Sequence, residues 1–215
     1  MIQQGRVKVN GKVTMDKGVI IDSINDMVII DDQPIQLENY FAYVMLHKPE
    51  GFITTLSDEF NRPTVIDLIS DVSKRLYPVG RLDCETSGLL LLTNDGNLTY
   101  QLTHPKHEVM KTYVAKIKGV PNKSAVNRLS NGIDIGGYIT APSFIEIAKQ
   151  DGSFCFVTIK IHEGKNRQVR KMFDAIHHPV ISLERISIGL LNIGNLAKGK
   201  WRYLTNDEII YLKSL

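Results

Sequence analysis

Four consecutive leucines, Leu89–Leu92, constrain the fold more than any other feature of the chain. They follow the segment 80–83 (Gly-Arg-Leu-Asp) and a Thr-Ser-Gly bend at 86–88, and they end at Asn-Asp-Gly in 94–96. A short apolar run between turn signals predicts a strand that is buried on both faces. We therefore expect Asp83 to lie at the start of a rigid buried strand, and rigid support suits a catalytic carboxylate.

Asp83 also has a purely structural interpretation. Aspartates commonly cap helices, and an aspartate beside an arginine such as Arg81 can form an ordinary salt bridge. The local pattern alone leaves both interpretations open.

Composition excludes several classes of protein. At 215 residues, with 43% hydrophobic and 23% charged residues, the chain is long enough for one core and a small appendage. It has neither an apolar run of the roughly 18 residues that a membrane helix needs nor an apolar N-terminus, so we expect a cytoplasmic protein without a membrane partner. Cys84 and Cys155 are far apart and no histidines cluster near them, which predicts no metal site.

The order of the patterns predicts an α+β fold. Residues 1–35 alternate short β-like runs with turns, including the hairpin signal Asn10-Gly11, and 36–42 is predicted to be a linker. Residues 43–215 mix strand and helix patterns irregularly, and many connections suit hairpins. We expect a mixed, largely antiparallel central sheet flanked by helices, with an active-site cleft.

A basic stretch stands out in the second half of the chain. Five positive side chains and one acid, Glu163, lie between residues 160 and 171; the positive ones are Lys160, Lys165, Arg167, Arg170 and Lys171. Asn166 is predicted to cap a helix whose apolar stripe includes Met172 and Phe173, with Arg167 and Arg170 on the opposite face. Such a patch suits a polyphosphate backbone, although a solvated helix face has the same pattern.

Tyr113 lies in a predicted strand at 110–118. An aromatic residue in a strand is usually part of the core, but a flat ring can also stack on an unpaired base.

Together these segments resemble the RsuA/RluB/RluE/RluF family of ribosomal RNA pseudouridine synthases. Four motifs occur in the family's order: Lys-Pro-Glu-Gly at 48–51, the segment 80–96, Lys-Thr-Tyr at 111–113, and Glu-Gly-Lys-Asn-Arg-Gln-Val-Arg-Lys-Met at 163–172. The wording of the last two is more similar to RluB than to RsuA, which favours 23S over 16S rRNA. The resemblance covers roughly residues 43–213, and it implies the pseudouridine synthase fold and a reaction that needs no cofactor.

The resemblance also implies roles for single residues. Asp83 matches the catalytic aspartate, Tyr113 the tyrosine on the target base, and Arg170 the arginine that pairs with the aspartate. Arg81 and Arg167 are expected to contact RNA, as are Lys48, Lys165 and Lys171. The partner is ribosomal RNA with its target uridine flipped out, and we expect a monomer.

Residues 5–34 resemble the second half of an S4 RNA-binding module. The paired helices that precede this half in the family are expected to be absent, which predicts a truncated S4 segment. A non-catalytic RNA-binding or ribosome-assembly factor on the same fold is the alternative. The presence of Asp83, Tyr113 and Arg170 together argues against that alternative, because a pure binder does not need all three.

Overall fold

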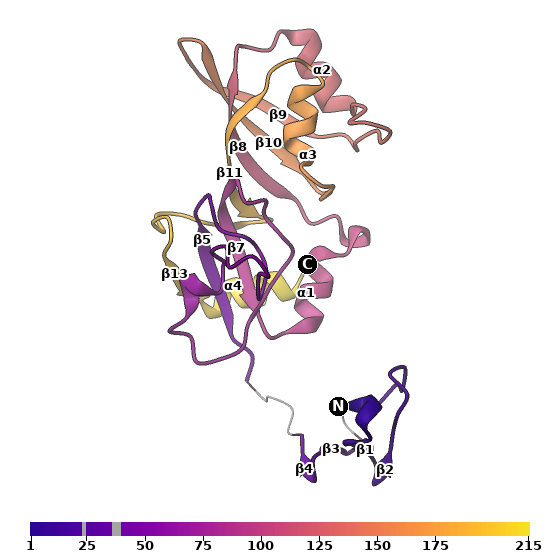
Figure 1. Ribbon diagram of the computed structural model, residues 1–215. Helices are drawn as coiled ribbons and strands as arrows, with labels where there is room; N and C mark the ends of the chain where they lie inside the picture. Colours follow the sequence, from indigo (N-terminus) through magenta and orange to yellow (C-terminus); the bar gives the residue numbers. More distant parts are fainter. Residues whose placement is uncertain (23–24, 36–39) are drawn as a thin grey trace. The chain divides into compact units, whose positions relative to one another are not determined.

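The computed structural model describes residues 1–22, 25–35 and 40–215 (Figure 1). The described chain forms two compact units, Met1–Phe41 and Ala42–Leu215. The linker predicted at 36–42 spans the boundary between them, and its residues 36–39 lie outside the described part. The assignment of the first unit to an S4 segment stays a prediction.

The first unit is a small antiparallel sheet. Its strands run in the order β2-β1-β3-β4, and Asn10 and Gly11 form the predicted turn with positive φ angles of 49° and 78°. Its elements are the 3-10 helix η1 (Ile2–Gln4) and the strands β1 (Val7–Val9), β2 (Lys12–Val13), β3 (Val28–Ile30) and β4 (Gln33–Pro34).

The second unit is built on a mixed sheet, as expected for an α+β fold. Among the described residues it has nine strands, seven of them in the order β13-β5-β7-β11-β8-β10-β9, with β12 beside β11 and β6 beside β7. The pairs are antiparallel except for β7 and β11, which run parallel. The strands are β5 (Tyr43–Lys48), β6 (Tyr77–Pro78), β7 (Thr86–Thr93), β8 (Lys111–Lys118), β9 (Phe144–Asp151), β10 (Phe154–Ile161), β11 (Val180–Ile188), β12 (Leu191–Asn192) and β13 (Trp201–Tyr203).

Helices cover both faces of this sheet. α2 and α3 contribute to the hydrophobic cluster on one face, and α1 and α4 contribute to the cluster on the other. The sequence Thr-Asn-Asp-Glu at 205–208 has the pattern of a capping box, and this capping box begins α4. The helical elements are α1 (Gly96–Thr103), α2 (Lys123–Asn131), α3 (Gln168–Asp174), α4 (Asn206–Lys213) and the 3-10 helices η2 (Asp67–Ile69) and η3 (Pro105–His107).

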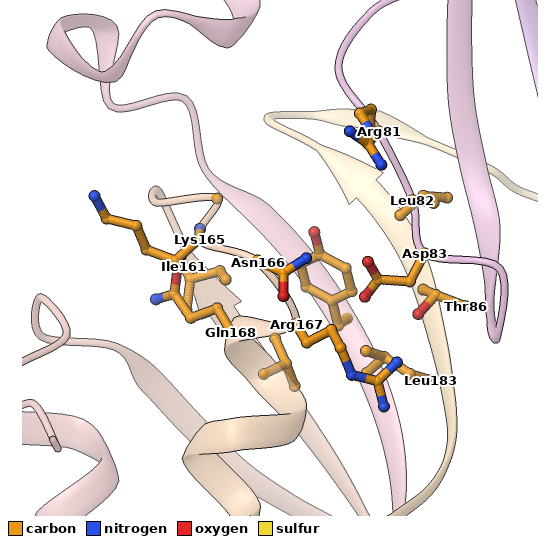
Figure 2. A pocket seen from close by; sticks show the side chains of 13 residues that line it. Arg81, Leu82, Asp83, Thr86, Ile161, Lys165, Asn166, Arg167, Gln168 and Leu183 are labelled. Carbon is orange, nitrogen blue, oxygen red and sulfur yellow. Dashed lines mark hydrogen bonds between the residues drawn. The ribbon is translucent and has the colours of Figure 1, made fainter. Parts of the chain in front are cut away.

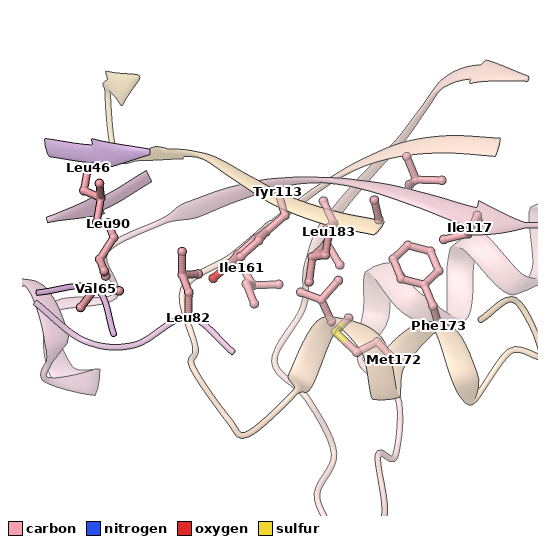
Figure 3. Close-up of a cluster of buried hydrophobic side chains, with 14 of the residues drawn as sticks. Leu46, Val65, Leu82, Leu90, Tyr113, Ile117, Ile161, Met172, Phe173 and Leu183 are labelled. Carbon is pink, nitrogen blue, oxygen red and sulfur yellow. The ribbon is translucent and has the colours of Figure 1, made fainter. Parts of the chain in front are cut away.

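The leucine run lies in β7, between β5 and β11, and it is buried as predicted. Leu90 and Leu92 belong to the core that α3 covers, whereas Leu89 and Leu91 belong to the core on the opposite face. Figure 3 shows Leu90 in the first of these cores together with Tyr113. A strand that packs on both faces cannot shift its register without moving side chains between two cores. The loop that contains Asp83 is therefore anchored at its C-terminal end, where β7 begins.

Gly88 allows β11 to approach β7 closely. Its φ is +111°, and a Cβ at this position would lie 2.2 Å from the backbone oxygen of Arg185. Only glycine fits this position, so the bend before the leucines is part of the sheet's packing.

Candidate active site

The main chain around Asp83 is fixed by hydrogen bonds from outside the loop. The buried Thr54 hydroxyl donates to Leu82 O at 2.7 Å and accepts a bond from Leu82 N at 3.3 Å. Thr86 N donates to Asp83 O at 3.0 Å, and Gly51 N donates to Cys84 O at 2.8 Å. The Asp83 backbone is thus held on both sides, while its carboxylate is directed into a pocket (Figure 2).

Lys48 supports this loop, and its burial in this structure does not fit the predicted contact with RNA. The side chain is fully buried at the end of β5, where a neighbouring strand and the loop exclude water. Its Nζ donates to the backbone oxygens of Thr86 at 2.9 Å, Asp83 at 3.1 Å and Cys84 at 3.4 Å, and to that of Pro49 at 3.0 Å. Burial lowers the pKa of the Lys48 ammonium to about 8, although the nearby Cys84, Glu50 and Asp83 oppose this shift.

Tyr113 lies in the wall of the same pocket. It is 9% exposed on β8 and belongs to the core cluster together with Leu82 and Leu183 (Figure 3). The pocket has a volume of about 250 Å³, and five of the eight predicted site residues line it: Arg81, Asp83, Tyr113, Lys165 and Arg167. Tyr113 is therefore both a core residue and a pocket-lining residue, and its stacking on a base stays a prediction.

The helix that carries the arginines begins later than predicted. Arg167, not Asn166, is the N-cap residue of α3, and it has a left-handed φ of 52° without a side-chain cap. Gln168 organises the preceding turn instead, because it accepts a bond from Lys165 N at 3.0 Å and donates to Glu163 at 2.7 Å. A positive φ at a residue other than glycine, asparagine or aspartate is uncommon and costly. Here it directs Arg167 toward the pocket that contains Asp83 (Figure 2).

The sequence predicted Arg170 on the face of the helix opposite the apolar stripe, paired with the Asp83 carboxylate, but its side chain is buried. It is 7% exposed, and its hydrogen-bond partners are backbone oxygens outside α3. Its Nη2 donates to Glu85 O at 2.8 Å and its Nη1 to Val180 O at 3.3 Å. Among the described residues, no lysine or arginine nitrogen lies within 4.0 Å of the Asp83 carboxylate, so the pair between Asp83 and Arg170 is not formed in this structure.

Glu85 is the site residue that the sequence analysis missed. Its carboxylate accepts a bond from Arg167 Nη1 at 3.0 Å and lies 3.9 Å from Arg170 Nε. The hydrogen bond from Arg167 is the main cause of the lowered pKa of the Glu85 carboxyl. Its place two residues after Asp83 was the only sequence signal that could have marked it.

The remaining predicted residues differ in position. Arg81 is exposed and borders the pocket, and Lys165 is exposed with its Nζ 4.4 Å from the centre of the Tyr138 ring. Lys171 is exposed on α3 but lines neither of the two cavities around Tyr113. Within the described ranges, no group of three or more histidine, cysteine or acidic residues could hold a metal ion.

Comparison with known proteins identifies the family. The profile of the RNA pseudouridylate synthase family matches residues 42–175, which is more than half of the chain and includes the pocket residues around Asp83 and Tyr113. The chain belongs to this family.

Relatives of this family match along nearly the whole chain. The ribosomal large subunit pseudouridine synthase B of Bacillus subtilis is 42% identical and is covered over 88% of its length, with 100% of this chain aligned. An RNA pseudouridine synthase of Aquifex aeolicus that is described as uncharacterized is 37% identical over 99% of this chain and 85% of its own. A crystal structure of a pseudouridylate synthase has a TM-score of 0.74 at 31% identity, covering 98% of this chain and 90% of that one.

In the described part of the chain, no helix is long and apolar enough to cross a membrane.

Proposed function

We propose that this pseudouridine synthase modifies one uridine of large-subunit ribosomal RNA, with Asp83 as its catalytic carboxylate. The observation that carries the proposal is the position of Asp83. Every backbone carbonyl from Leu82 to Thr86 accepts a hydrogen bond from a side chain outside the loop. The Asp83 side chain itself points into a cavity bordered by Tyr113 and arginines. The 42% identity to the large-subunit synthase of Bacillus subtilis supports the choice of RNA.

The reaction is an isomerisation in which nothing is added or lost. The bond between N1 of the uracil and C1′ of the ribose breaks, the base rotates, and C5 then bonds to C1′ while the proton of C5 is lost and N1 gains one. The uridine must leave its stack to reach the pocket. Tyr113 is placed to pack on the flipped base, and such stacking contributes about 1–3 kcal/mol per base.

Asp83 has one of two roles in this scheme. It attacks C1′ as a nucleophile, or it removes a proton from the ribose as a general base. Both roles require an ionised carboxylate whose oxygens are directed at the sugar. A ribose deuterated next to C1′ should slow the reaction only if Asp83 is the base.

The assay is formation of pseudouridine in rRNA by the purified protein. Wild-type protein should modify a single uridine of 23S rRNA transcripts, and cells that lack the protein should lose one pseudouridine from 23S rRNA. Asp83→Asn should abolish the reaction while its melting temperature and RNA affinity stay near wild type. Retained modification by Asp83→Asn would overturn the role of Asp83, and a lost 16S site would overturn the choice of large-subunit RNA. RNA binding without any pseudouridine would support the non-catalytic alternative.

A further inference from the structure

A second cavity adjoins the pocket of Asp83 at Tyr113. Its volume is about 470 Å³, and it shares Arg81, Tyr113, Gly164 and Lys165 with that pocket. Val79, Leu102 and Ile188 give it an apolar wall. We refer to it below as the rear compartment. None of the roles discussed so far uses it.

The rear compartment is strongly cationic. Four positive side chains line it, namely Arg81, Lys111, Lys165 and Arg185, against the single carboxylate of Glu163. That carboxylate is already occupied, because it accepts bonds from the Tyr138 hydroxyl, from Ala141 N at 3.0 Å and from Gln168 Nε2 at 2.7 Å. The single negative charge of Glu163 also balances only one of the four positive charges, so the compartment keeps an excess of positive charge.

Arg185 has unused hydrogen-bond donors in this wall. The residue is 3% exposed, and its Nε donates to Leu89 O at 2.8 Å. Its Nη2 is buried without a hydrogen-bond partner, and among the described residues no carboxylate lies within 4.0 Å of the guanidinium. A buried guanidinium with unpaired N–H groups is costly unless an anion completes it.

Lys111 lies close enough to Arg185 to feel its charge. Its Nζ donates to Val109 O and to His162 O, both at 3.1 Å, which leaves one of its three N–H donors for a ligand. Burial and then repulsion by Arg185 lower the pKa of Lys111 to about 8. Two neighbouring cations that repel each other are stabilised together by one anion placed between them.

The geometry points to the rear compartment as the binding site for a backbone phosphate of the RNA next to the flipped uridine, held by Lys111 and Arg185. This inference rests on the proposed function, because a uridine in the pocket of Asp83 would bring its neighbouring phosphodiester to Arg81 and Lys165, which line both cavities. The volume and the apolar wall leave room for part of the adjoining nucleotide. A charge-assisted hydrogen bond from Arg185 would then fix the strand while the uracil rotates.

The test compares charge removal in the compartment with charge removal elsewhere. Lys111→Gln and Arg185→Gln are made in the Asp83→Asn background, so that binding is measured without reaction. The matched controls are Lys149→Gln and Arg128→Gln, which lose the same charge at exposed positions outside both cavities. The RNA is the 23S segment that the Asp83→Asn protein protects from nuclease. Each compartment variant should bind it about tenfold more weakly, with a salt slope lower by about 1, and the controls should bind it nearly as wild type does.

A methylphosphonate scan identifies the phosphate itself. One phosphate beside the target uridine is replaced by a neutral methylphosphonate. The Asp83→Asn protein, which keeps Lys111 and Arg185, should then bind the RNA more weakly by the same factor as the variants do. In the Lys111→Gln protein the replacement should have no further effect, since the partners are already separated. A flat scan, or effects that multiply in the variant, would overturn the site. If Arg185→Gln does not fold, the Lys111→Gln arm and the scan on wild-type residues still decide the outcome.

The two proposals can fail separately. A sensitive phosphate in the scan without pseudouridine formation by the wild-type protein would leave the rear compartment in place and refute the proposed function. Pseudouridine formation with a flat scan would do the reverse. Inorganic phosphate is a probe that needs no RNA: it should raise the melting temperature of the wild-type protein and not of Lys111→Gln, and equal shifts in the two proteins would count against the site.

Discussion

Replacing Lys48 by methionine tests whether this lysine supports the loop of Asp83 or contacts RNA. Methionine keeps the length and the apolar part of the side chain but removes four hydrogen bonds to backbone oxygens. Two of these oxygens, of Asp83 and Cys84, keep one N–H partner each from Thr86 and Gly51. The remaining cost falls on the oxygens of Thr86 and Pro49 and on the fixed geometry of the loop.

The magnitude follows from two opposing terms. An ammonium has three N–H donors, so the four contacts amount to three bonds, and at about 1.5 kcal/mol for each bond from a charged donor they contribute roughly 4.5 kcal/mol. Burial of the ammonium, which lowers the pKa of Lys48 from 10.5 to about 8, costs roughly 3 kcal/mol. The variant should thus lose roughly 1.5 kcal/mol of its free energy of unfolding, or about 3–6 °C in melting temperature for a unit of this size. It should still fold.

The functional effect should appear in kcat rather than in RNA binding. A shift of the Asp83 carboxylate by about 1 Å lowers a rate by about 10²-fold. The assay is single-turnover pseudouridine formation, together with the salt dependence of the Kd for RNA. Lys165→Met is the control: this exposed lysine at the pocket rim should reduce the salt slope and leave the melting temperature unchanged. A Lys48→Met protein with wild-type kcat and melting temperature but a reduced salt slope would refute the reasoning.

Three further predictions concern the surroundings of the site. Gly88→Ala should cost more than about 4 kcal/mol or prevent folding, because its Cβ would clash with the backbone of Arg185, whereas Gly96→Ala meets no atom within 4 Å and should be tolerated; soluble yield and melting temperature decide. Glu85→Gln should tighten RNA binding up to about fivefold at low salt by releasing Arg167, and weaker binding would contradict this. The folded-state pKa values of Lys48 and Lys111 lie near 8, below the 10.5 of the unfolded chain, so the unfolded state binds more protons above pH 8. The free energy of unfolding should therefore rise between pH 8 and 9.5. Lys48→Met and Lys111→Met should each flatten this rise, as measured by chemical denaturation.

Local signals predicted much of the fold. The leucine run, the Asn10-Gly11 hairpin and the Thr205–Glu208 capping box each depend on residues within a few positions of one another, so their structures follow from propensity and turn chemistry. The position of β11 shows where local signals end. It pairs in parallel with β7, almost 100 residues earlier, and no local pattern records such a contact.

The errors in the site share a physical cause. Lys48 was expected to contact RNA and Arg170 to pair with the Asp83 carboxylate, because charged side chains are usually exposed or paired with an opposite charge. Both are buried because the loop of Asp83 lies across them and offers its carbonyl oxygens as partners. Sequence spacing shows which face of a helix is apolar, but it does not show that a distant loop covers the polar face as well. Arg170 is buried on α3 although it lies on the polar face.

The arrangement separates two tasks that a single arginine was expected to perform. Lys48 and Arg170 donate hydrogen bonds to the main chain of the loop at Asp83, Cys84, Glu85 and Thr86. These two buried positive side chains therefore fix the backbone position from which the Asp83 side chain extends. Glu85 binds Arg167 and lies near Arg170, and among the described residues neither arginine approaches the Asp83 carboxylate within 4.0 Å. In the proposed reaction, a direct ion pair would occupy carboxylate oxygens that are needed at the ribose. Support through the backbone positions Asp83 as firmly while leaving those oxygens to the substrate.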